Sequence, residues 1–276
     1  MRIALCNEVL APMNFARQCE LAAALGYDGL EVAPFTLGDN VLALTAAQRA
    51  QIRRAAQDAG IVVSGLHWLL ARPPGLSITS GDAAVRQRTL DMLRGLVDLC
   101  ADLGGAMLVH GSPAQRRLPD GDAAQPAREH ALQVIAAAAT HAGSAGLTYC
   151  IEALAPPEAN FINTLQEAAD VVRRLGVPSL RTMLDCCAAA RAEARSPAQL
   201  LDEWLPSGLI AHVQVNDPNR RGPGQGDLSF APIFAALRRH HYDGWVAVEP
   251  FDYQPDGPTC AARAIGYVRG ILEGLP

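Results

Sequence analysis

"HYDGWVAVEPF", residues 241–251, pairs with "GYDGLEVAPF", residues 26–35, near the other end of the chain. In each stretch, Tyr-Asp-Gly leads from a helical pattern into an apolar run, as expected for a helix-to-strand turn. Each run also carries an acid, Glu249 or Glu31. An unpaired buried carboxylate costs several kcal/mol (~2–7 even for a neutral polar group), so each acid needs solvent or a positive partner. The two stretches therefore predict strands of one repeating unit, and each strand carries an acid that must contact solvent or a positive group.

The same alternation of apolar runs and helical patterns continues along the chain. The apolar runs lie at residues 1–7, 29–35, 61–70, 106–113, 147–154, 180–187, 209–217 and 245–251. The clearest helical patterns are 15–26, 46–60, 84–105 and 165–176, and glycines 26, 60, 104, 146 and 176 stand where helices should end. Near-continuous apolar strands alternating with helices indicate a parallel sheet covered by helices.

Chain length selects among parallel folds. Units of about 30 residues, repeated over the 276 residues, match a closed (β/α)8 TIM barrel of the α/β class. An open doubly wound sheet is the alternative, but no G-x-G-x-x-G motif follows the first run. Since no linker composition interrupts the alternation, we expect a single domain over residues 1–276.

Composition excludes several classes of protein. The seven cysteines (6, 19, 100, 150, 186, 187 and 260) form no CxxC pair, so neither a disulfide framework nor a structural zinc site is expected. A net charge of −5 gives no general attraction for nucleic acid or anionic membranes. No apolar run approaches the roughly 20 residues of a membrane helix, and the N-terminus lacks a secretory signal pattern. We therefore expect a cytoplasmic protein with no nucleic-acid or membrane partner.

Polar residues stand at the ends of most predicted strands, and in a parallel barrel these ends meet at the mouth. In chain order they are Glu31, His67, His110, Glu152, Asp185, His212 with Gln214 on the same strand face, and Glu249. Three converging carboxylates, from the fifth, sixth and eighth strands, would repel one another. A divalent cation would hold all three ionised in a partly buried site. A single acid at such a position is otherwise a helix cap or a loop ligand.

The other candidate residues at the mouth have the following expected roles. His67 and His110 are expected either to bind substrate or support the metal ligands, or to be satisfied rim residues. We expect Glu31 to orient a neighbouring side chain by hydrogen bonding. Trp68 and Trp245 are interpreted as packing residues rather than platforms for a substrate.

Two further segments carry weaker expectations. Residues 112–128, "SPAQRRLPDGDAAQPAR", predict a flexible loop over the barrel mouth, in which Arg116 and Arg117 are solvated charges. The apolar helical stretch 131–143 could bury a partner subunit, so a homo-oligomer stays open as an expectation.

Four short motifs give the chain a family resemblance. They are "IEAL" at 151–154, "LD" at 184–185, "HVQVND" with an Arg and "GxG" at 212–226, and "VEPF" at 248–251. As a set, they resemble the xylose isomerase-like barrel superfamily. Its members include ketose 3-epimerases, hydroxypyruvate isomerases, inosose dehydratases and apurinic endonucleases, and the resemblance covers almost the whole chain.

The resemblance implies roles for individual residues. Glu152, Asp185, Gln214 and Glu249 fall where the family binds one divalent metal ion, and Glu152 and Glu249 also match its two acid/base residues. Glu158 and Arg220 match positions that hold substrate oxygens, and His212 joins Glu31 behind the ligands. The ligand shell is all oxygen, which favours hard ions such as Mn²⁺ or Mg²⁺ over zinc.

Two residues depart from the epimerase pattern. Epimerases usually carry His where this chain has Gln214, whereas the hydroxypyruvate isomerase branch is similar in using Gln. Epimerases also have a substrate-binding His three residues after the aspartate, where this chain has Ala188. Ala188 therefore removes a side chain with which epimerases bind their ketose substrate.

The resemblance implies a metal-dependent sugar isomerase or epimerase acting on a ketose or related hydroxy-carbonyl, small-molecule substrate. A metal that chelates a carbonyl and the adjacent hydroxyl would stabilise an enediolate, while one Glu removes a proton and the other returns it. A sugar or inosose dehydratase is the alternative, since loss of a β-hydroxyl starts from the same intermediate. An apurinic endonuclease lacks support, because Ala188, Gln214 and "GDLS" at 226–229 replace expected ligands. A non-catalytic sugar-binding barrel is the third option.

Overall fold

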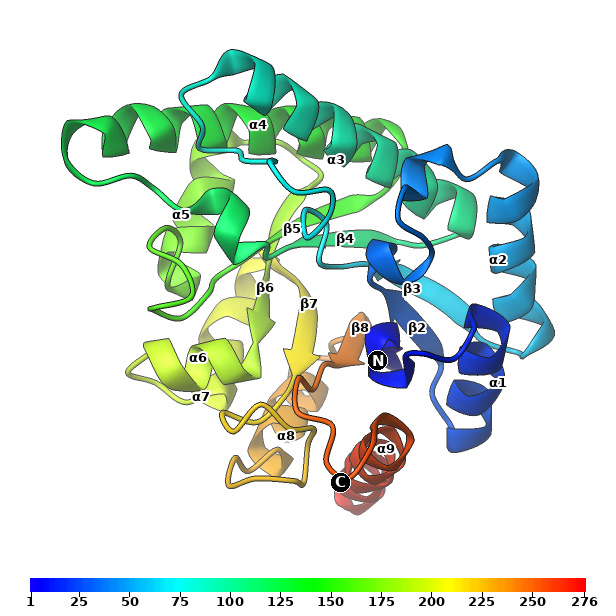
Figure 1. Cartoon of the computed structure of the whole chain (residues 1–276). Helices are drawn as coiled ribbons and strands as arrows, with labels where there is room; N and C mark the ends of the chain where they lie inside the picture. Colours follow the sequence, from blue (N-terminus) through cyan, green and yellow to red (C-terminus); the bar gives the residue numbers. More distant parts are fainter.

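Eight parallel strands close into a barrel in the computed structural model, which describes residues 1–276 (Figure 1). The strands are β1 Arg2–Cys6, β2 Gly29–Val32, β3 Val62–Leu66, β4 Met107–His110, β5 Thr148–Glu152, β6 Leu180–Asp185, β7 Ile210–Val215 and β8 Trp245–Val248. They pair in chain order, and β8 closes the ring against β1, with Arg2 opposite Trp245. The predicted single-domain TIM barrel is confirmed.

Helices follow the strands and surround the barrel. They are α1 Phe15–Leu25, α2 Ala46–Asp58, α3 Ala83–Leu103, α4 Ala124–Ser144, α5 Leu165–Leu175, α6 Cys186–Ala192, α7 Pro197–Trp204, α8 Ala231–Arg239 and α9 Gly257–Gly274. The two longest helices, α3 and α4, pack side by side on one flank (Figure 1). Two short helices, α6 and α7, share the connection between β6 and β7, where the sequence alternation predicts one unit.

The two Tyr-Asp-Gly stretches are helix-to-strand turns, as predicted. The backbone N–H of Tyr27 donates to the carbonyl of Ala22 at 3.0 Å, and that of Tyr242 donates to Leu237 at 2.9 Å. Each turn thus ties the end of one helix to the start of the next strand. The five predicted stop glycines all have positive φ, from 60° to 93°, which is the left-handed conformation that ends a helix.

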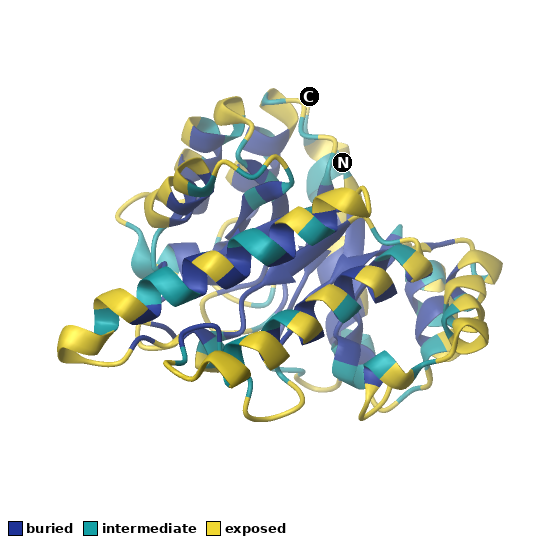
Figure 2. Cartoon of the chain, turned by 90° about the horizontal axis from the view of Figure 1, so that it is seen from above, coloured by how far each residue is buried: buried dark blue, intermediate teal, exposed yellow.

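The main core lies between the strands and the helices. In Figure 2 the strands are buried apart from residues near the start of some of them, while the helices carry a buried stripe inward and exposed residues outward. A separate small cluster, Val109, Cys150 and Met183, fills part of the barrel interior. At the opposite end from the mouth, Gly29 leaves room for the Trp245 ring, which a Cβ at 29 would approach within 2.9 Å. These two groups fill the lower interior, so polar residues concentrate at the mouth.

Residues 112–128 differ from the predicted flexible loop. They form two short 3-10 helices, Pro113–Arg116 and Gly121–Ala123, and the first turn of α4. Arg116 is fully buried, so the expectation that it is a solvated charge is wrong. The apolar stretch 131–143 is largely buried within the chain as the inner face of α4, and does not by itself indicate a partner.

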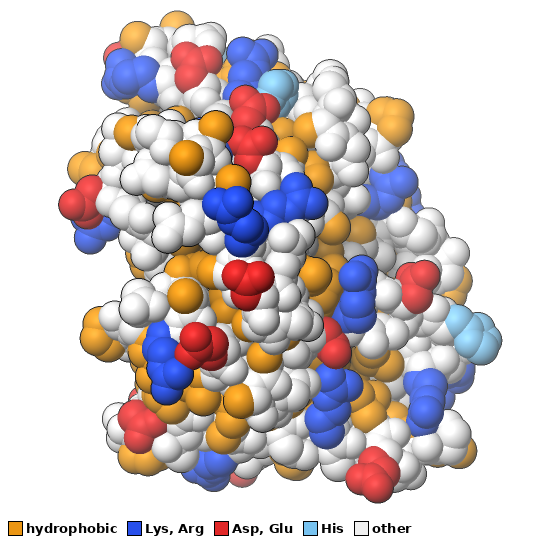
Figure 3. All heavy atoms as spheres, turned by 90° about the vertical axis from the view of Figure 1, so that its right-hand side faces the viewer, with side chains coloured by type: hydrophobic (Ala, Val, Ile, Leu, Met, Phe, Trp, Pro, Cys, Tyr) orange, Lys and Arg blue, Asp and Glu red, His pale blue; other side chains and the backbone are white.

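The cysteines, the surface charges and the helix lengths bear on the expectations drawn from composition. All seven cysteines are free and buried. On the face shown in Figure 3, basic and acidic side chains are interspersed rather than gathered by sign. None of the helices combines the length and the apolar character that crossing a membrane demands.

Candidate active site

A cavity of about 220 Å³ opens at the carboxyl ends of the strands, and we call it the catalytic cavity. Its lining includes all four predicted metal ligands, Glu152, Asp185, Gln214 and Glu249, with His67, Glu158 and Arg220. These seven residues come from five different strand ends or the loops after them. The barrel mouth therefore brings together most of the side chains that the sequence singled out.

Glu152 ends β5 and is held in place from behind. Its backbone carbonyl accepts a hydrogen bond from the buried Arg116 at 2.6 Å, and Arg116 also donates to the carbonyl of Ile162 at 3.1 Å. Gly111 lies directly beside its carboxylate, because a Cβ at that position would stand 2.1 Å from Oε2. The carboxylate itself has no hydrogen-bond partner within the chain, so it is free to act on a ligand.

Asp185 is the last residue of β6 and the N-cap of α6. Its Oδ1 accepts from the Ala188 N–H at 2.6 Å, and its Oδ2 accepts from Asn216 Nδ2 at 2.7 Å. Asp185 therefore does cap the N-terminus of α6. Since each carboxylate oxygen has two acceptor sites, capping leaves lone pairs for a further partner.

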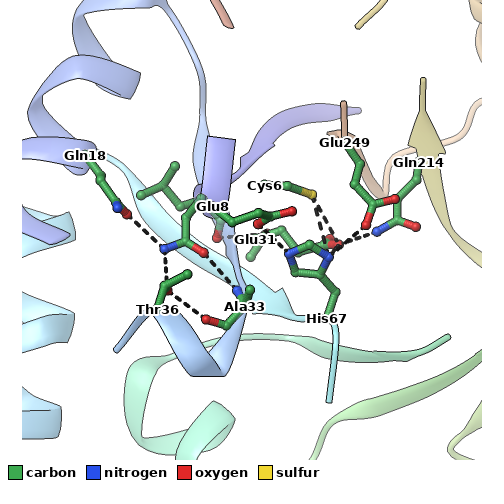
Figure 4. A network of polar contacts seen from close by, with 12 residues as sticks. Cys6, Glu8, Gln18, Glu31, Ala33, Thr36, His67, Gln214 and Glu249 are labelled. Carbon is green, nitrogen blue, oxygen red and sulfur yellow. Dashed lines mark hydrogen bonds and ion pairs between the residues drawn. The ribbon is translucent and has the colours of Figure 1, made fainter. Parts of the chain in front are cut away.

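Gln214 lies opposite Asp185 in the β6–β7 register. Its Nε2 donates to Glu31 Oε1 at 2.7 Å, which fixes the amide orientation, and its Oε1 is buried without any partner (Figure 4). His212 Nε2 lies 2.7 Å from Glu31 Oε2, although not aligned for a hydrogen bond. Burial alone would raise the pKa of Glu31, but His212, with His67 and Gln214, lowers it below its usual value. The Glu31 carboxylate is thus held ionised behind Gln214.

Glu249 follows β8 and is bonded to His67. His67 Nδ1 lies 3.0 Å from Glu249 Oε1, and its Nε2 lies 3.0 Å from Glu8 Oε2, so the imidazole bridges two carboxylates (Figure 4). Burial alone would lower the pKa of His67, but Cys6, Glu8 and the Glu249 hydrogen bond raise it well above its usual value. In its protonated form, His67 has an N–H to donate to each of these acids. Candidate ligand atoms of Cys6, Glu8, His67 and Glu249 also lie within 4.8 Å of one another, which the hydrogen bonds of His67 largely explain.

Three buried acids of the cavity, Glu152, Asp185 and Glu249, resist ionisation. Burial, together with the charges of Asp185 and Glu249, raises the pKa of Glu152 well above its usual value. Burial raises the pKa of Asp185 to about 6 and that of Glu249 to about 8, although hydrogen bonds partly offset both shifts. A divalent cation would relieve this cost, and the partnerless Oε1 of Gln214 offers it a neutral oxygen ligand. The residues therefore fit such an ion, although the three carboxylates are not packed as tightly as the cluster around His67.

His110 is the one predicted site residue that the structure does not bring to the others. Strand alternation turns its neighbours Val109 and Gly111 into the cavity, so His110 points outward, where its Nδ1 lies 2.6 Å from the Tyr149 hydroxyl. Burial and the charge of Arg116 lower its pKa to about 3, which keeps the ring neutral. The substrate-binding role expected for His110 has no support in this geometry.

The outer cavity wall carries two arginines. Arg220 forms no ion pair and stacks over the Phe251 ring, with its guanidinium carbon 5.2 Å from the centroid. Glu158 pairs with Arg191 at 2.5 Å. Arg191 was not singled out from the sequence, but it lies one helical turn beyond Ala188 on α6, so the spacing from Asp185 could have indicated it.

Trp68 also lines the catalytic cavity, contrary to the expectation that it only packs. Its ring meets that of Phe251 in an edge-on arrangement, with centroids 6.3 Å apart. Trp245, by contrast, is buried at the closed end of the barrel beneath the site, as a packing residue, with the Arg2 guanidinium carbon 4.1 Å from its ring centroid.

Comparisons with known proteins agree with this architecture. The family model described as "Xylose isomerase-like TIM barrel" matches residues 19–271. A D-psicose 3-epimerase of Agrobacterium fabrum is 30% identical over 245 residues, covering 86% of this chain and 80% of that protein. A 2-oxo-tetronate isomerase of Cupriavidus necator is 26% identical over 204 residues, covering 70% and 75%. A crystal structure of D-psicose 3-epimerase with D-fructose superposes with a TM-score of 0.82 at 22% identity, covering 99% and 100%.

Proposed function

The chain belongs to the xylose isomerase-like TIM barrel family as a sugar isomerase or epimerase. We propose that it acts on a ketose or a related hydroxy-carbonyl sugar and that it uses one divalent metal ion. In this proposal Glu152, Asp185, Gln214 and Glu249 hold the ion, and Glu152 and Glu249 exchange the substrate proton. The observation that carries it is the buried, partnerless Oε1 of Gln214 in a cavity shared with three carboxylates. The relatives named as sugar epimerases and isomerases support the same class of substrate.

A bound divalent cation supplies Lewis-acid polarisation of a carbonyl and its adjacent hydroxyl, and a hard ion such as Mn²⁺ or Mg²⁺ suits the oxygen ligands. The chain's own residues handle the proton. Glu152, whose carboxylate makes no hydrogen bond, would remove the proton from the carbon next to the carbonyl. Glu249, steadied by His67 at 3.0 Å, would return it. Return to the opposite face of the same carbon gives an epimer, and return to the neighbouring carbon gives an isomer.

The remaining cavity residues would bind and enclose the substrate. The unpaired guanidinium of Arg220 and the Glu158–Arg191 pair offer donors and acceptors to sugar hydroxyls. Trp68 and Phe251 cover the apolar side of the cavity and would exclude water from the reacting carbon.

Isosteric variants test the assignment. With Mn²⁺ present, Glu152→Gln and Glu249→Gln should each lower turnover of a ketose panel by roughly 10²–10⁴-fold, the usual share of general acid–base catalysis. The exposed Glu20→Gln serves as the control and should retain normal turnover. If either active-site variant binds Mn²⁺ and keeps turnover within about threefold, far short of that share, the acid/base assignment is wrong.

Product analysis separates the proposed reaction from its nearest rival. A dehydratase would use the same base and cation but would expel a β-hydroxyl, so its product has lost water. Reaction in heavy water should give an epimer or isomer with one deuterium on the exchanged carbon. A dehydrated product from inososes, with no exchange into any ketose, would assign the chain to the dehydratases.

A further inference from the structure

A second cavity of about 390 Å³ adjoins the catalytic cavity, and we call it the side cavity. Its lining residues are Glu8, Phe35, Trp68, Ala71, Arg72, Phe251 and Tyr253. Trp68 and Phe251 line both cavities, so the two cavities meet at this edge-on aromatic pair. A ligand held in the catalytic cavity could therefore extend past the pair into the side cavity.

The lining of the side cavity resembles that of a ligand site. Aromatic residues make up only 5% of the chain, yet four of the seven lining residues are aromatic, and all four are half-buried. Polar groups with spare capacity accompany them. The Arg72 side chain and the Tyr253 hydroxyl form no hydrogen bond within the chain, and Glu8 Oε1 is buried without a partner. Apolar walls with a few unsatisfied polar groups are typical of small-molecule sites.

The backbone of Trp68 provides an independent indication. Its φ is 52°, in the left-handed region that bulky side chains rarely adopt. Such a conformation costs on the order of 1–3 kcal/mol and persists mainly where the surroundings hold it for function. Here it places the indole where the two cavities meet, so the strained residue is the one that a shared ligand would touch.

We propose that the side cavity binds a ring substituent joined to the sugar through a glycosidic oxygen, so that the substrate is a keto-sugar glycoside rather than a free sugar. This inference rests on the proposed function and specifies its substrate class. The apolar face of the ring, whether an aromatic aglycone or a second sugar, stacks on Trp68 and meets the nearly perpendicular Phe251 ring edge-on. Arg72, Tyr253 and Glu8 meet its oxygens. The catalytic cavity alone, at about 220 Å³, is smaller than the roughly 300–1,000 Å³ of typical ligand sites.

Binding of simple glycosides to the full chain with Mn²⁺ tests the proposal without any turnover. The probes are methyl β-D-glucoside, phenyl β-D-glucoside and cellobiose, followed by calorimetry and tryptophan fluorescence. Trp204 and Trp245 are 7% and 2% exposed, so quenching by a ring would report on the half-buried Trp68. We expect phenyl glucoside or cellobiose to bind about tenfold more tightly than methyl glucoside, which corresponds to one good aromatic contact. The tighter of the two identifies the kind of ring.

Variants confined to the side cavity give the proposal its control. Phe35→Ala and Tyr253→Ala remove walls that the catalytic cavity does not share, and each should reduce the preference for a ring by about threefold or more. Phe15→Ala truncates a half-buried phenylalanine on α1, outside both cavities, and should leave the preference unchanged.

Two results would overturn the side-cavity proposal, and a third would overturn the proposed function instead. Equal affinity for methyl and ring-bearing glycosides overturns the side-cavity proposal, even if free ketoses are turned over. So does a dimer whose association Phe35→Ala weakens while no glycoside quenches Trp68, because the patch is then a subunit interface. Tight ring binding with no turnover of any ketose or keto-glycoside overturns the proposed function instead.

Discussion

Replacing Gly111 with alanine tests whether the Glu152 carboxylate must stand where the structure has it. The new Cβ would lie 2.1 Å from Oε2 of Glu152, well inside the 3.4 Å at which ordinary contacts begin. Gly111 does not have positive φ, so alanine is compatible with its backbone. The carboxylate must therefore move by about 1 Å or more, a displacement that typically costs about 10²-fold in rate.

The assay measures kcat on a ketose substrate with Mn²⁺, alongside the free energy of unfolding in urea. The unfolding free energy should change little, because a compatible Gly→Ala change gains about 0.4–1 kcal/mol from the unfolded chain and the clash offsets it. Gly266→Ala, on α9 with no atom within 4 Å of its Cβ, is the matched control. It should raise stability by about 0.5–1 kcal/mol and leave kcat unchanged. A Gly111→Ala enzyme with normal kcat would refute the role assigned to Glu152.

Three further outcomes follow from the same contacts. Arg116→Met should lower the free energy of unfolding by about 2–4 kcal/mol, because two buried carbonyls lose their donor. Arg117→Met, at the exposed neighbouring position, is the control and should change this free energy by no more than about 0.5 kcal/mol. Equal urea midpoints for the two variants would contradict the prediction. Gln214→His should shift metal preference from Mn²⁺ toward Zn²⁺ in competition titrations, since imidazole suits softer ions, and an unchanged preference would exclude Gln214 as a ligand. Asn216→Ala should weaken Mn²⁺ binding by about 10–100-fold in thermal-shift titrations, because Asp185 loses the amide 2.7 Å away that orients it.

The fold was predictable because the barrel repeats one local rule. The units bury short apolar strands on both faces and turn into the next strand through a few residues, and the first five helices each stop at or beside a left-handed glycine. Parallel strands also place their carboxyl ends on one rim, so Glu152, Asp185 and Glu249 had to approach one another once the barrel was assumed. Neither inference needs a tertiary contact to be known in advance.

Other features depend on contacts that the sequence does not encode locally. Arg116 is buried because the carbonyls of Glu152 and Ile162, 36 and 46 residues later, happen to face it. His110 and Glu152 both end their strands, but only Glu152 points into the cavity. A four-residue apolar strand such as β4 does not reveal which of its alternating residues faces inward. The missed orientation of His110 follows from that ambiguity.

The two strands that follow a Tyr-Asp-Gly turn each carry a glutamate, and the pKa values of these two glutamates are shifted in opposite directions. Glu31 lies within β2, where Gln214 donates to one of its oxygens and His212 lies 2.7 Å from the other, and its pKa is lowered. Glu249 stands one residue beyond β8, where His67 contacts one oxygen and the other side faces the cavity; burial raises its pKa to about 8. Two residues along the strand, from one before its end to one past it, thus separate a sealed charge from one that is open to a ligand. Because Glu31 holds Gln214 and Gln214 shares the cavity with Glu249, the sealed acid orients the amide that lies beside the open one.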